Sequence, residues 1–294
     1  MIDASHFDAS TAYASVDRHQ LQDFDPYIYR TRDKGRSWQR ITNGLPAGVY
    51  VHCVKEDHLR RGLLVAGTER GVYLSLDDGD NWQPLKLNLP VTSMRDFEIY
   101  GNDLIVGTHG RGIWVIDDIS PLRQLTDAVL ASDAFLFKPA DAYNYIQGDD
   151  NGTPTQKDEP QADNPPAGAF IDYYLKSAAR TPVTLEILDA SGKVLHTFSS
   201  APAGQTAIGR ANRASAGIPR ISPLWVTAPE PFSAAAGVHR VAWNPVVEIP
   251  AAPGVDGGQA RTELLTGTFT AKLLANGQSY VQPFIVKPDP RARI

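Results

Sequence analysis

The chain of 294 residues contains a single cysteine, Cys53, so it cannot form an intrachain disulfide. This excludes a small secreted module held together by disulfides. No apolar run approaches the roughly eighteen residues that a membrane-spanning helix needs. Residues 1–6 have neither the basic nor the apolar part of a secretory signal. The sequence as given therefore predicts no membrane insertion and carries no export signal.

Charged residues of both signs are spread along the chain without a basic tract or an acidic tail. Lys and Arg total 28 against 33 Asp and Glu, and the formal net charge is −5 at pH 7. This balance argues against nucleic acid or an anionic membrane surface as the main partner. With 24 glycines and 22 prolines, the chain is expected to have many turns and short elements rather than long helices.

An element with Ser or Thr, Asp, Gly and Trp at fixed positions occurs twice in the first half of the chain. It spans residues 31–38 and residues 75–82, and the register holds over the flanking positions without a gap. A degenerate third copy follows, because residues 104–114 echo residues 64–73, although the closing Gly and Trp are missing. Each unit of about 44 residues holds four short β-rich runs, which is typical of a β-propeller blade.

The repeated element resembles the Asp-box, also called the BNR repeat. In such a turn the Asp side chain accepts hydrogen bonds from nearby backbone N–H groups, and Gly takes a left-handed conformation. The Trp side chain fills the gap toward the next hairpin. We therefore expect a structural role, without chemistry, for the box residues, which are Asp33, Gly35, Trp38, Asp77, Gly79 and Trp82.

Three further segments, residues 27–31, 67–73 and 108–114, extend the resemblance. Together with the box they are similar to bacterial sortilin-like Asp-box propeller proteins, which are grouped with glycosyl hydrolases because sialidases and oligoxyloglucan hydrolases share the box. The resemblance implies a fold but not a reaction, since propellers host many functions. It also implies a periplasmic or extracellular location.

Residues 1–125 encode about three four-stranded blades, whereas a propeller closes with roughly four to eight. We therefore predict an all-β fold that begins with an incomplete propeller. No inner strand is evident before residues 11–16, so the first blade is expected to begin partway through. An open array of blades leaves strand edges and one blade face uncovered. The remaining blades are thus expected from a longer chain, of which this is the C-terminal part, or from self-association.

Residues 126–167 lose the repeat and become polar and rich in proline, which indicates a linker or long surface loop. Residues 168–294 then predict a β-sandwich, with an excursion over residues 199–236. Within this half, residues 183–193 and 267–273 resemble the immunoglobulin-like module that closes many bacterial surface proteins. No chemical motif appears here, so we expect a spacer or interaction role. The alternating runs are 169–175, 183–188, 194–198, 237–243, 268–274 and 280–286.

In a propeller, the connections between the second and third strands of successive blades gather on one face, around the central channel. An arginine in each of these connections can form a bidentate pair with an anionic peptide or glycan. In the alternative reading, Arg70 and Arg111 join neighbouring blades by pairing with Asp or Glu or by capping carbonyls. The predicted ligand-binding residues are Arg18, His19, Glu69, Arg70, His109 and Arg111.

Glycoside hydrolysis needs two carboxyl groups that face each other across the substrate. Asp17 and Glu69 are the catalytic candidates, with Asp23 and Asp25 beside them, but sequence spacing does not supply their separation. Single histidines without a coherent ligand set favour a structural role over metal binding for His19 and His109. No Ser-His-Asp elbow, phosphate loop or zinc spacing is visible, so we predict no metal and no cofactor.

These observations leave more than one function open. The favoured one is a non-catalytic binding or scaffold protein whose propeller face holds a peptide or glycan. The competing one is a glycoside hydrolase, sialidase-like or glucan-cleaving, of which this chain is the C-terminal part. A third is that the chain alone has no function.

Overall fold

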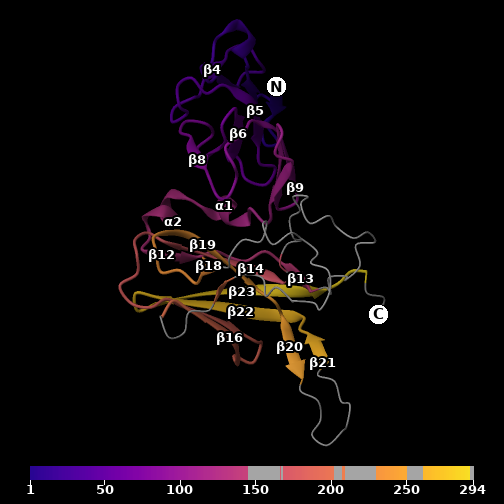
Figure 1. The fold of residues 1–294 in the computed structure, drawn as a ribbon, viewed down its shortest axis with the longest axis vertical. Coiled ribbons are helices and arrows are strands. Elements are labelled where there is room, and N and C mark those ends of the chain that lie inside the picture. The colour runs from indigo at the N-terminus through magenta and orange to yellow at the C-terminus, as the bar shows by residue number, and fades with distance from the viewer. Residues whose placement is uncertain (145–165, 167, 202–206, 209–229, 250–260, 292–294) are drawn as a thin grey trace, which may run out of the picture. The chain divides into compact units, whose positions relative to one another are not determined.

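The structure, a computed structural model, describes residues 1–144, 166, 168–201, 207–208, 230–249 and 261–291. The chain divides into two compact units, Met1–Thr126 and Asp127–Ile294. Strands make up nearly all the regular structure, so the fold is all-β, as predicted (Figure 1). The helices of the described part are short, and none is long and apolar enough to cross a membrane. They are η1 (His19–Leu21), α1 (Ser120–Gln124) and α2 (Asp127–Ala131).

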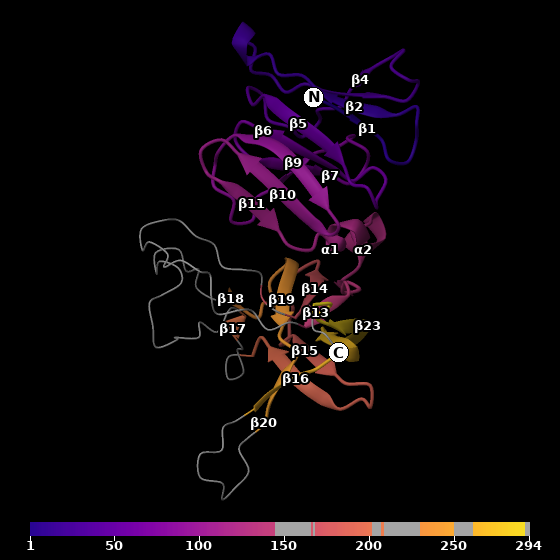
Figure 2. The same ribbon diagram turned by 90° about the vertical axis from the view of Figure 1, so that its right-hand side faces the viewer.

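The first unit consists of three antiparallel sheets in which neighbouring strands are also consecutive in the chain (Figure 2). Each strand pairs with the next one along the chain, so each sheet is a meander built from one stretch of sequence. Sheet 1 contains β1 (Ile2–Ala4), β2 (Ala12–Ser15), β3 (Ile28–Thr31) and β4 (Gln39–Arg40). Sheet 2 contains β5 (Val51–Glu56), β6 (Leu64–Thr68), β7 (Val72–Ser75) and β8 (Gln83–Leu85). Sheet 3 contains β9 (Met94–Tyr100), β10 (Asp103–Thr108) and β11 (Ile113–Ile116).

Two of these sheets differ from the prediction. Strand β1 pairs with β2 from Ile2 to Ala4, so sheet 1 has four strands and does not begin partway through. The sequence hid this strand because it is only three residues long and mostly exposed. Sheet 3 has three strands instead of four, because the chain after β11 turns into α1. Pro121 stands in the first turn of α1, where it favours a helix and cannot donate to a sheet.

The sheets pack face to face through alternating side chains. Ile28 of sheet 1 belongs to one hydrophobic cluster with Val51, Leu64 and Ala66 of sheet 2. The opposite face of sheet 2 forms a second cluster with sheet 3, which contains Cys53, Leu63, Val65, Val72, Leu74, Met94, Phe97, Leu104 and Val106. Sheet 2 is therefore covered on both faces, which explains why every residue of β6 is buried.

The turns after β3 and β7 are built from the same hydrogen bonds. Thr31 Oγ1 accepts from the Gly35 N–H at 2.9 Å, and its hydroxyl donates to Asp33 Oδ1 at 2.9 Å. Asp33 then accepts from the Ser37 N–H at 2.9 Å and from its hydroxyl at 2.6 Å. The turn after β7 repeats these four contacts with Ser75, Gly79, Asp77 and Asn81.

The glycines of these turns have φ angles of +83° at Gly35 and +88° at Gly79, a region that disfavours a side chain. Space adds a second constraint at Gly79, because a Cβ atom there would lie 2.3 Å from Ile41 Cδ1. The closing tryptophans differ in environment. Trp82 is buried and its indole N–H donates to the Ile41 carbonyl of sheet 1 at 2.9 Å, whereas Trp38 is exposed. Trp82 has a preceding sheet to pack against, and Trp38 has none among the described residues.

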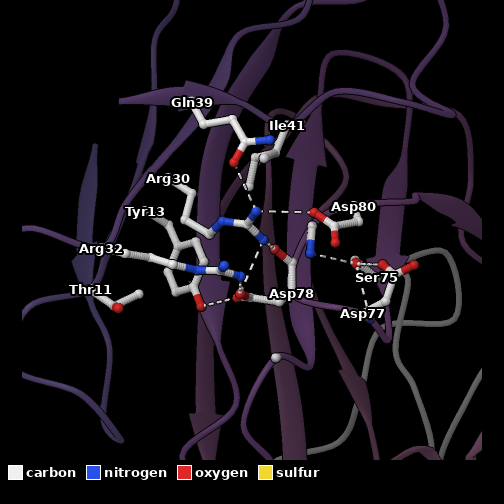
Figure 3. A network of polar contacts seen from close by, with 12 residues as sticks. Thr11, Tyr13, Arg30, Arg32, Gln39, Ile41, Ser75, Asp77, Asp78 and Asp80 are labelled. Carbon is white, nitrogen blue, oxygen red and sulfur yellow. Dashed lines mark hydrogen bonds and ion pairs between the residues drawn. The ribbon is translucent and has the colours of Figure 1, made fainter. Parts of the chain in front are cut away.

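An ionic network joins sheet 1 to the turn after β7 (Figure 3). The Arg30 side chain is 3% exposed, and its guanidinium lies 3.0 Å from Asp78 Oδ2 and 3.1 Å from Asp80 Oδ1. The Tyr13 hydroxyl donates to Asp78, and Arg32 pairs with the same carboxylate from the solvent side. A buried charge needs such partners because its desolvation is costly. The network therefore fixes the register of the two sheets.

The second unit contains two larger sheets that share one core. Side chains from β14, β19, β15, β22 and β23 meet in this core, and Ile171, Trp243, Leu185 and Phe284 are among them. One sheet has the order β12-β14-β19, with β12 (Ala134–Leu136), β14 (Ala169–Leu175) and β19 (Gly237–Trp243). The other has the order β13-β23-β22-β15-β16, with β13 (Ala142–Asn144), β15 (Thr184–Leu188), β16 (Val194–Ser199), β22 (Gly267–Ala275) and β23 (Gln278–Pro288). Two antiparallel strand pairs complete the unit, β17 (Ala207–Ile208) with β18 (Glu230–Pro231), and β20 (Val246–Ile249) with β21 (Arg261–Leu264).

The predicted linker over residues 126–167 is wrong for residues 127–144. These residues form α2, β12 and β13, and both strands join the sheets of the second unit. Short runs such as Ala134–Leu136 become strands only because β14 pairs with them across a long sequence separation. The rest of the predicted linker, except residues 126 and 166, lies outside the described residues, as does most of the predicted excursion at 199–236.

We expect Arg30→Ala to lower the free energy of unfolding of the first unit by about 3 kcal/mol, because it leaves Asp78 short of a buried partner. The matched control is Arg32→Ala, whose side chain is 60% exposed and whose loss is expected to cost less than about 1 kcal/mol. Urea unfolding of both full-length variants measures the difference. Equal losses of stability in the two variants would contradict the central role of Arg30 in the network.

A second prediction concerns the stability of the chain at acidic pH. Hydrogen bonds from Ser37 and Thr31 lower the pKa of Asp33 from its ordinary 3.8 to about 2. A folded-state pKa below the unfolded one adds stability that is complete above pH 3.8 and is lost as the pH falls toward 2. The urea midpoint of Asp33→Asn should therefore fall less between about pH 5 and about pH 2 than that of the unaltered chain. An unchanged acid slope would contradict this role of the turn.

Candidate functional site

Loops at the ends of the strands bring six polar or aromatic residues of the first unit together. Asp17 and His19 follow β2, and Glu69 follows β6. Tyr50 and Ser93 directly precede β5 and β9, and His52 lies within β5. Because each residue stands at a strand end of a packed sheet, three sheets contribute to one group. We call Asp17, His19, Tyr50, His52, Glu69 and Ser93 the His52 cluster.

The imidazole of His52 lies between two carboxylates. Its Nδ1 is 3.3 Å from Asp17 Oδ2, and its Nε2 is 2.9 Å from Glu69 Oε2. The ring is nearly buried, with 6% of the side chain exposed. A ring that faces a carboxylate on each side can donate to both only as the doubly protonated imidazolium. His52 thus ties the loop after β2 to the loop after β6.

Glu69 is held by several donors at once. Burial raises its pKa, but hydrogen bonds from His52, Ser93 and Tyr50 outweigh burial and bring the pKa below its ordinary value. Burial and the bond to Glu69 raise the pKa of the Tyr50 phenol in turn. Ser93 Oγ also lies 3.0 Å from His52 Nε2. Glu69 is therefore an ionised acceptor within a closed set of contacts.

Asp17 is fixed by the loop that carries it. Its Oδ1 accepts from the His19 N–H at 3.0 Å and lies 2.6 Å from the His19 ring. Burial raises the pKa of Asp17, but these bonds and the nearby histidines outweigh burial and lower it. The His19 ring stacks on Tyr50, with 4.8 Å between centroids. Phe24, which is exposed, lies 6.0 Å from Tyr50 by the same measure.

Arg18 does not join the cluster. Its guanidinium lies 3.0 Å from Asp23 Oδ2 and 5.5 Å from the centre of the Tyr27 ring. Asp23 also accepts from the Tyr27 hydroxyl at 2.9 Å and from the Asp25 N–H at 3.2 Å. Arg18, Asp23 and Asp25 therefore shape the loop before β3 through their contacts with each other and with Tyr27.

Arg70 and Arg111 occupy equivalent hairpins in neighbouring sheets. Thr68 Oγ1 accepts from the Arg70 N–H at 3.2 Å, and Thr108 Oγ1 accepts from the Arg111 N–H at 3.2 Å. Both residues are exposed. Within the described ranges, neither guanidinium forms an ion pair or a side-chain hydrogen bond. The contacts that would join neighbouring sheets through these arginines are thus not seen there.

His109 lies at the same end of sheet 3 as Arg111. Its N–H donates to the Ser93 carbonyl at 2.9 Å, and its own carbonyl accepts from the Thr92 hydroxyl at 3.0 Å. The residue is exposed, so its backbone anchors the loop while the ring stays at the surface. This backbone contact links the loop after β10 to Ser93 of the His52 cluster.

Sequence reasoning missed His52, Tyr50 and Ser93. His52 stands in an apolar strand, where a histidine reads as part of the core, and Ser93 lies among ordinary turn residues. Alternation gives no signal here, because Val51 and Cys53 belong to the clusters on opposite faces of sheet 2 and the strand register shifts between them. Its two carboxylate partners come from different sheets, which no local pattern reveals.

The geometry limits what the cluster can do chemically. Asp17 and Glu69 are separated by the ring that binds both, so no sugar linkage can lie between them. Ser93 approaches a ring nitrogen that already faces Glu69, so His52 is not free to act as its base. Among the residues that the structure describes, no group of three His, Cys, Asp or Glu is placed to hold a metal ion.

No protein-family model and no curated protein matches this chain. Among solved structures, it is similar to an ancestral GH74 enzyme, with 10% sequence identity and a TM-score of 0.32. The alignment covers 95% of this chain and 42% of that enzyme's chain, so this chain spans less than half of that structure's length. A TM-score this low says nothing about the activity of this chain.

We expect His52→Ala to lower the free energy of unfolding by about 2 kcal/mol, because it leaves Asp17 and Glu69 without their shared, nearly buried donor. His19→Ala is the matched control, since its ring is one-third exposed and its loss should cost less than about 1 kcal/mol. Thermal or urea unfolding of the full chain compares the two. A larger effect at His19 would contradict the central place of His52.

Proposed function

We propose that the first unit is three blades of an incomplete β-propeller of the Asp-box type, and that the second unit is an immunoglobulin-like sandwich. The first part is supported by the chain-order meander of each sheet, the face-to-face packing of successive sheets and the matching turns after β3 and β7. The second part is supported by two sheets that enclose one core. The sandwich serves as a spacer or interaction module.

The proposed function is non-catalytic binding of an anionic peptide or glycan by the loops after β6 and β10. The observation that carries it is the pair of exposed arginines, Arg70 and Arg111, at equivalent hairpin positions of neighbouring sheets. An exposed guanidinium without an internal partner is suited to a bidentate pair with a carboxylate. Two such groups on adjacent blades recognise a ligand that carries more than one negative charge.

The His52 cluster supports this role because its contacts hold the loops after β2 and β6 in place. The ring of His52 contacts both carboxylates, so neither carboxylate is left without a partner beneath a bound anionic ligand. Phe24 and Tyr50 add aromatic surface beside it, against which a sugar ring or an apolar side chain can stack. The cluster thus contributes rigidity and surface, and the arginines contribute recognition.

The competing proposal, a glycoside hydrolase, requires a carboxyl pair with substrate between its members. Of the predicted candidates, Asp17 and Glu69 are bound to one ring, and Asp23 is engaged by Arg18 and Tyr27. Asp25 accepts from the Gly48 N–H at 3.4 Å. The described geometry therefore favours binding over hydrolysis.

Titration calorimetry with two probes tests the proposal. The probes are an oligogalacturonate, which carries carboxylates on sugars, and a glutamate-rich peptide. We expect one of them to bind, with an affinity that falls as salt rises. In Arg70→Gln with Arg111→Gln, the affinity should drop roughly a hundredfold, since each charge-assisted pair contributes about a factor of ten or more.

The matched control is Arg36→Gln, an exposed arginine in the turn after β3, at the other end of the strands. This variant should bind like the unaltered chain. Equal weakening by the control, or binding of a neutral oligosaccharide as tight as that of the acidic one, would contradict recognition by Arg70 and Arg111. Turnover of aryl glycosides that is abolished by Glu69→Gln would instead establish the hydrolase.

A further inference from the structure

The first strands of sheets 2 and 3 contain the same irregularity. In β5 the pairing with β6 shifts on either side of His52, and in β9 the pairing with β10 shifts on either side of Arg95. Each strand therefore has one extra residue, a β-bulge, which turns a side chain away from the regular alternation. Arg95 is thus the residue of sheet 3 that is equivalent to His52 of sheet 2.

The hairpins of the two sheets supply a second pair of equivalent residues. The Glu69 N–H donates to the Tyr50 carbonyl at 3.1 Å, and the His109 N–H donates to the Ser93 carbonyl at 2.9 Å. Tyr50 and Ser93 directly precede β5 and β9. His109 therefore occupies in sheet 3 the position that Glu69 occupies in sheet 2.

A basic side chain at the bulge has a carboxylate partner on the hairpin of sheet 2 but not on that of sheet 3. In sheet 2, His52 Nε2 lies 2.9 Å from Glu69 Oε2. In sheet 3, the bulge carries Arg95, and the hairpin carries His109, which offers no negative charge. The comparison involves only residues of these two sheets. It indicates an acceptor that sheet 3 itself does not provide.

The acidic residues near Arg95 do not provide this acceptor. Glu69 of sheet 2 is held by three donors of the His52 cluster. Asp96 follows Arg95 in the sequence, and its Oδ1 accepts from the Phe97 N–H at 2.9 Å. Arg95 is exposed, and within the ranges that the structure describes its guanidinium forms no ion pair or hydrogen bond.

The bulge of β9 is fixed against sheet 2. A Cβ atom at Gly67 would lie 2.7 Å from the Met94 carbonyl oxygen, so glycine is needed for the two backbones to approach this closely. The Cys53 thiol also contacts this oxygen, with 3.8 Å between Sγ and O. Arg95 directly follows Met94, so its backbone is held in place before a ligand binds.

Electrostatics also connects Arg95 to the His52 cluster. Burial is the main cause of the raised pKa of the Tyr50 phenol, and the charge of Arg95 acts in the opposite direction. This charge therefore lies close enough to Tyr50 to influence it. Arg95 thus stands between the cluster and the hairpin that carries Arg111.

We propose that Arg95 binds a carboxylate of the ligand, and that His109 and Arg111 complete this subsite on sheet 3. The ligand's carboxylate then takes the place that Glu69 fills in sheet 2. A guanidinium can donate two parallel hydrogen bonds to a carboxylate, and the imidazole of His109 can donate one more. The inference rests on the proposed function and narrows its ligand to one with a carboxylate beyond those that Arg70 and Arg111 bind.

Titration calorimetry with the oligogalacturonate and the glutamate-rich peptide tests the subsite. Arg95→Gln should weaken binding of the probe that the full chain binds by roughly tenfold, because one charge-assisted pair is lost. Arg36→Gln is the matched control, since it removes the same charge from an exposed arginine in the turn after β3 and should leave the affinity unchanged.

A second measurement tests the geometry without any ligand. His109→Glu gives sheet 3 the hairpin carboxylate that sheet 2 has. The new carboxylate should pair with Arg95, so the urea midpoint of the full chain should rise in His109→Glu but not when Arg95→Gln is also present. His109→Glu should also weaken binding of the probe, because its carboxylate occupies Arg95 and repels the anion.

The outcomes separate this inference from the proposed function. If Arg70→Gln with Arg111→Gln weakens binding but Arg95→Gln binds like the unaltered chain, the subsite is wrong and the proposed function stands. A stability change from His109→Glu that is the same with and without Arg95 would overturn the placement of Arg95 opposite His109. Failure of both probes to bind the unaltered chain would overturn the proposed function and the subsite together.

Discussion

Face-to-face packing of successive sheets is the constraint on which the first unit depends. A strand of two to seven residues buries little surface by itself, and each sheet here becomes stable only when a neighbouring sheet covers its apolar side chains. Sheet 2 is covered twice, first by sheet 1 through Ile28 and the Arg30 network and then by sheet 3 through Phe97 and Leu104. Stability is therefore shared between neighbouring sheets.

The candidate site is a consequence of the same packing. Because the sheets are stacked in register, their corresponding loops lie at one end, and residues from three sheets meet around His52. The two catalytic candidates, Asp17 and Glu69, are both engaged by the nearly buried His52 ring. What remains at the surface is a pair of arginines on matched hairpins, on which the proposed recognition of an anionic ligand depends. In a preorganised binding surface, rigid internal contacts hold the exposed charged groups in position, which lowers the entropy cost of binding.

The sequence predicts the fold well wherever a pattern is local. The repeat predicts the order of strands in sheets 1 and 2, and alternation predicts β14 and β19 within the limits that the structure gives them. It fails where pairing is distant or short, as for β1, β12 and β13. At the site, it identifies Asp17, His19 and Glu69 from their place in the loops. It misses His52, because the role of this histidine depends on contacts with Asp17, which follows a strand of sheet 1, and with Glu69, which is distant in the sequence but follows a strand of the same sheet.

The most direct test of the central claim uses Cys53, the single thiol, which lies between sheets 2 and 3 and is fully buried. Burial raises its pKa to about 12, so labelling requires the sheets to separate. The account predicts that a thiol reagent labels the native chain at least about a thousand times more slowly than the urea-unfolded chain, and that Phe97→Ala in sheet 3 speeds the labelling. Labelling of the native chain at the rate of the unfolded chain would contradict the packing of sheet 3 on sheet 2.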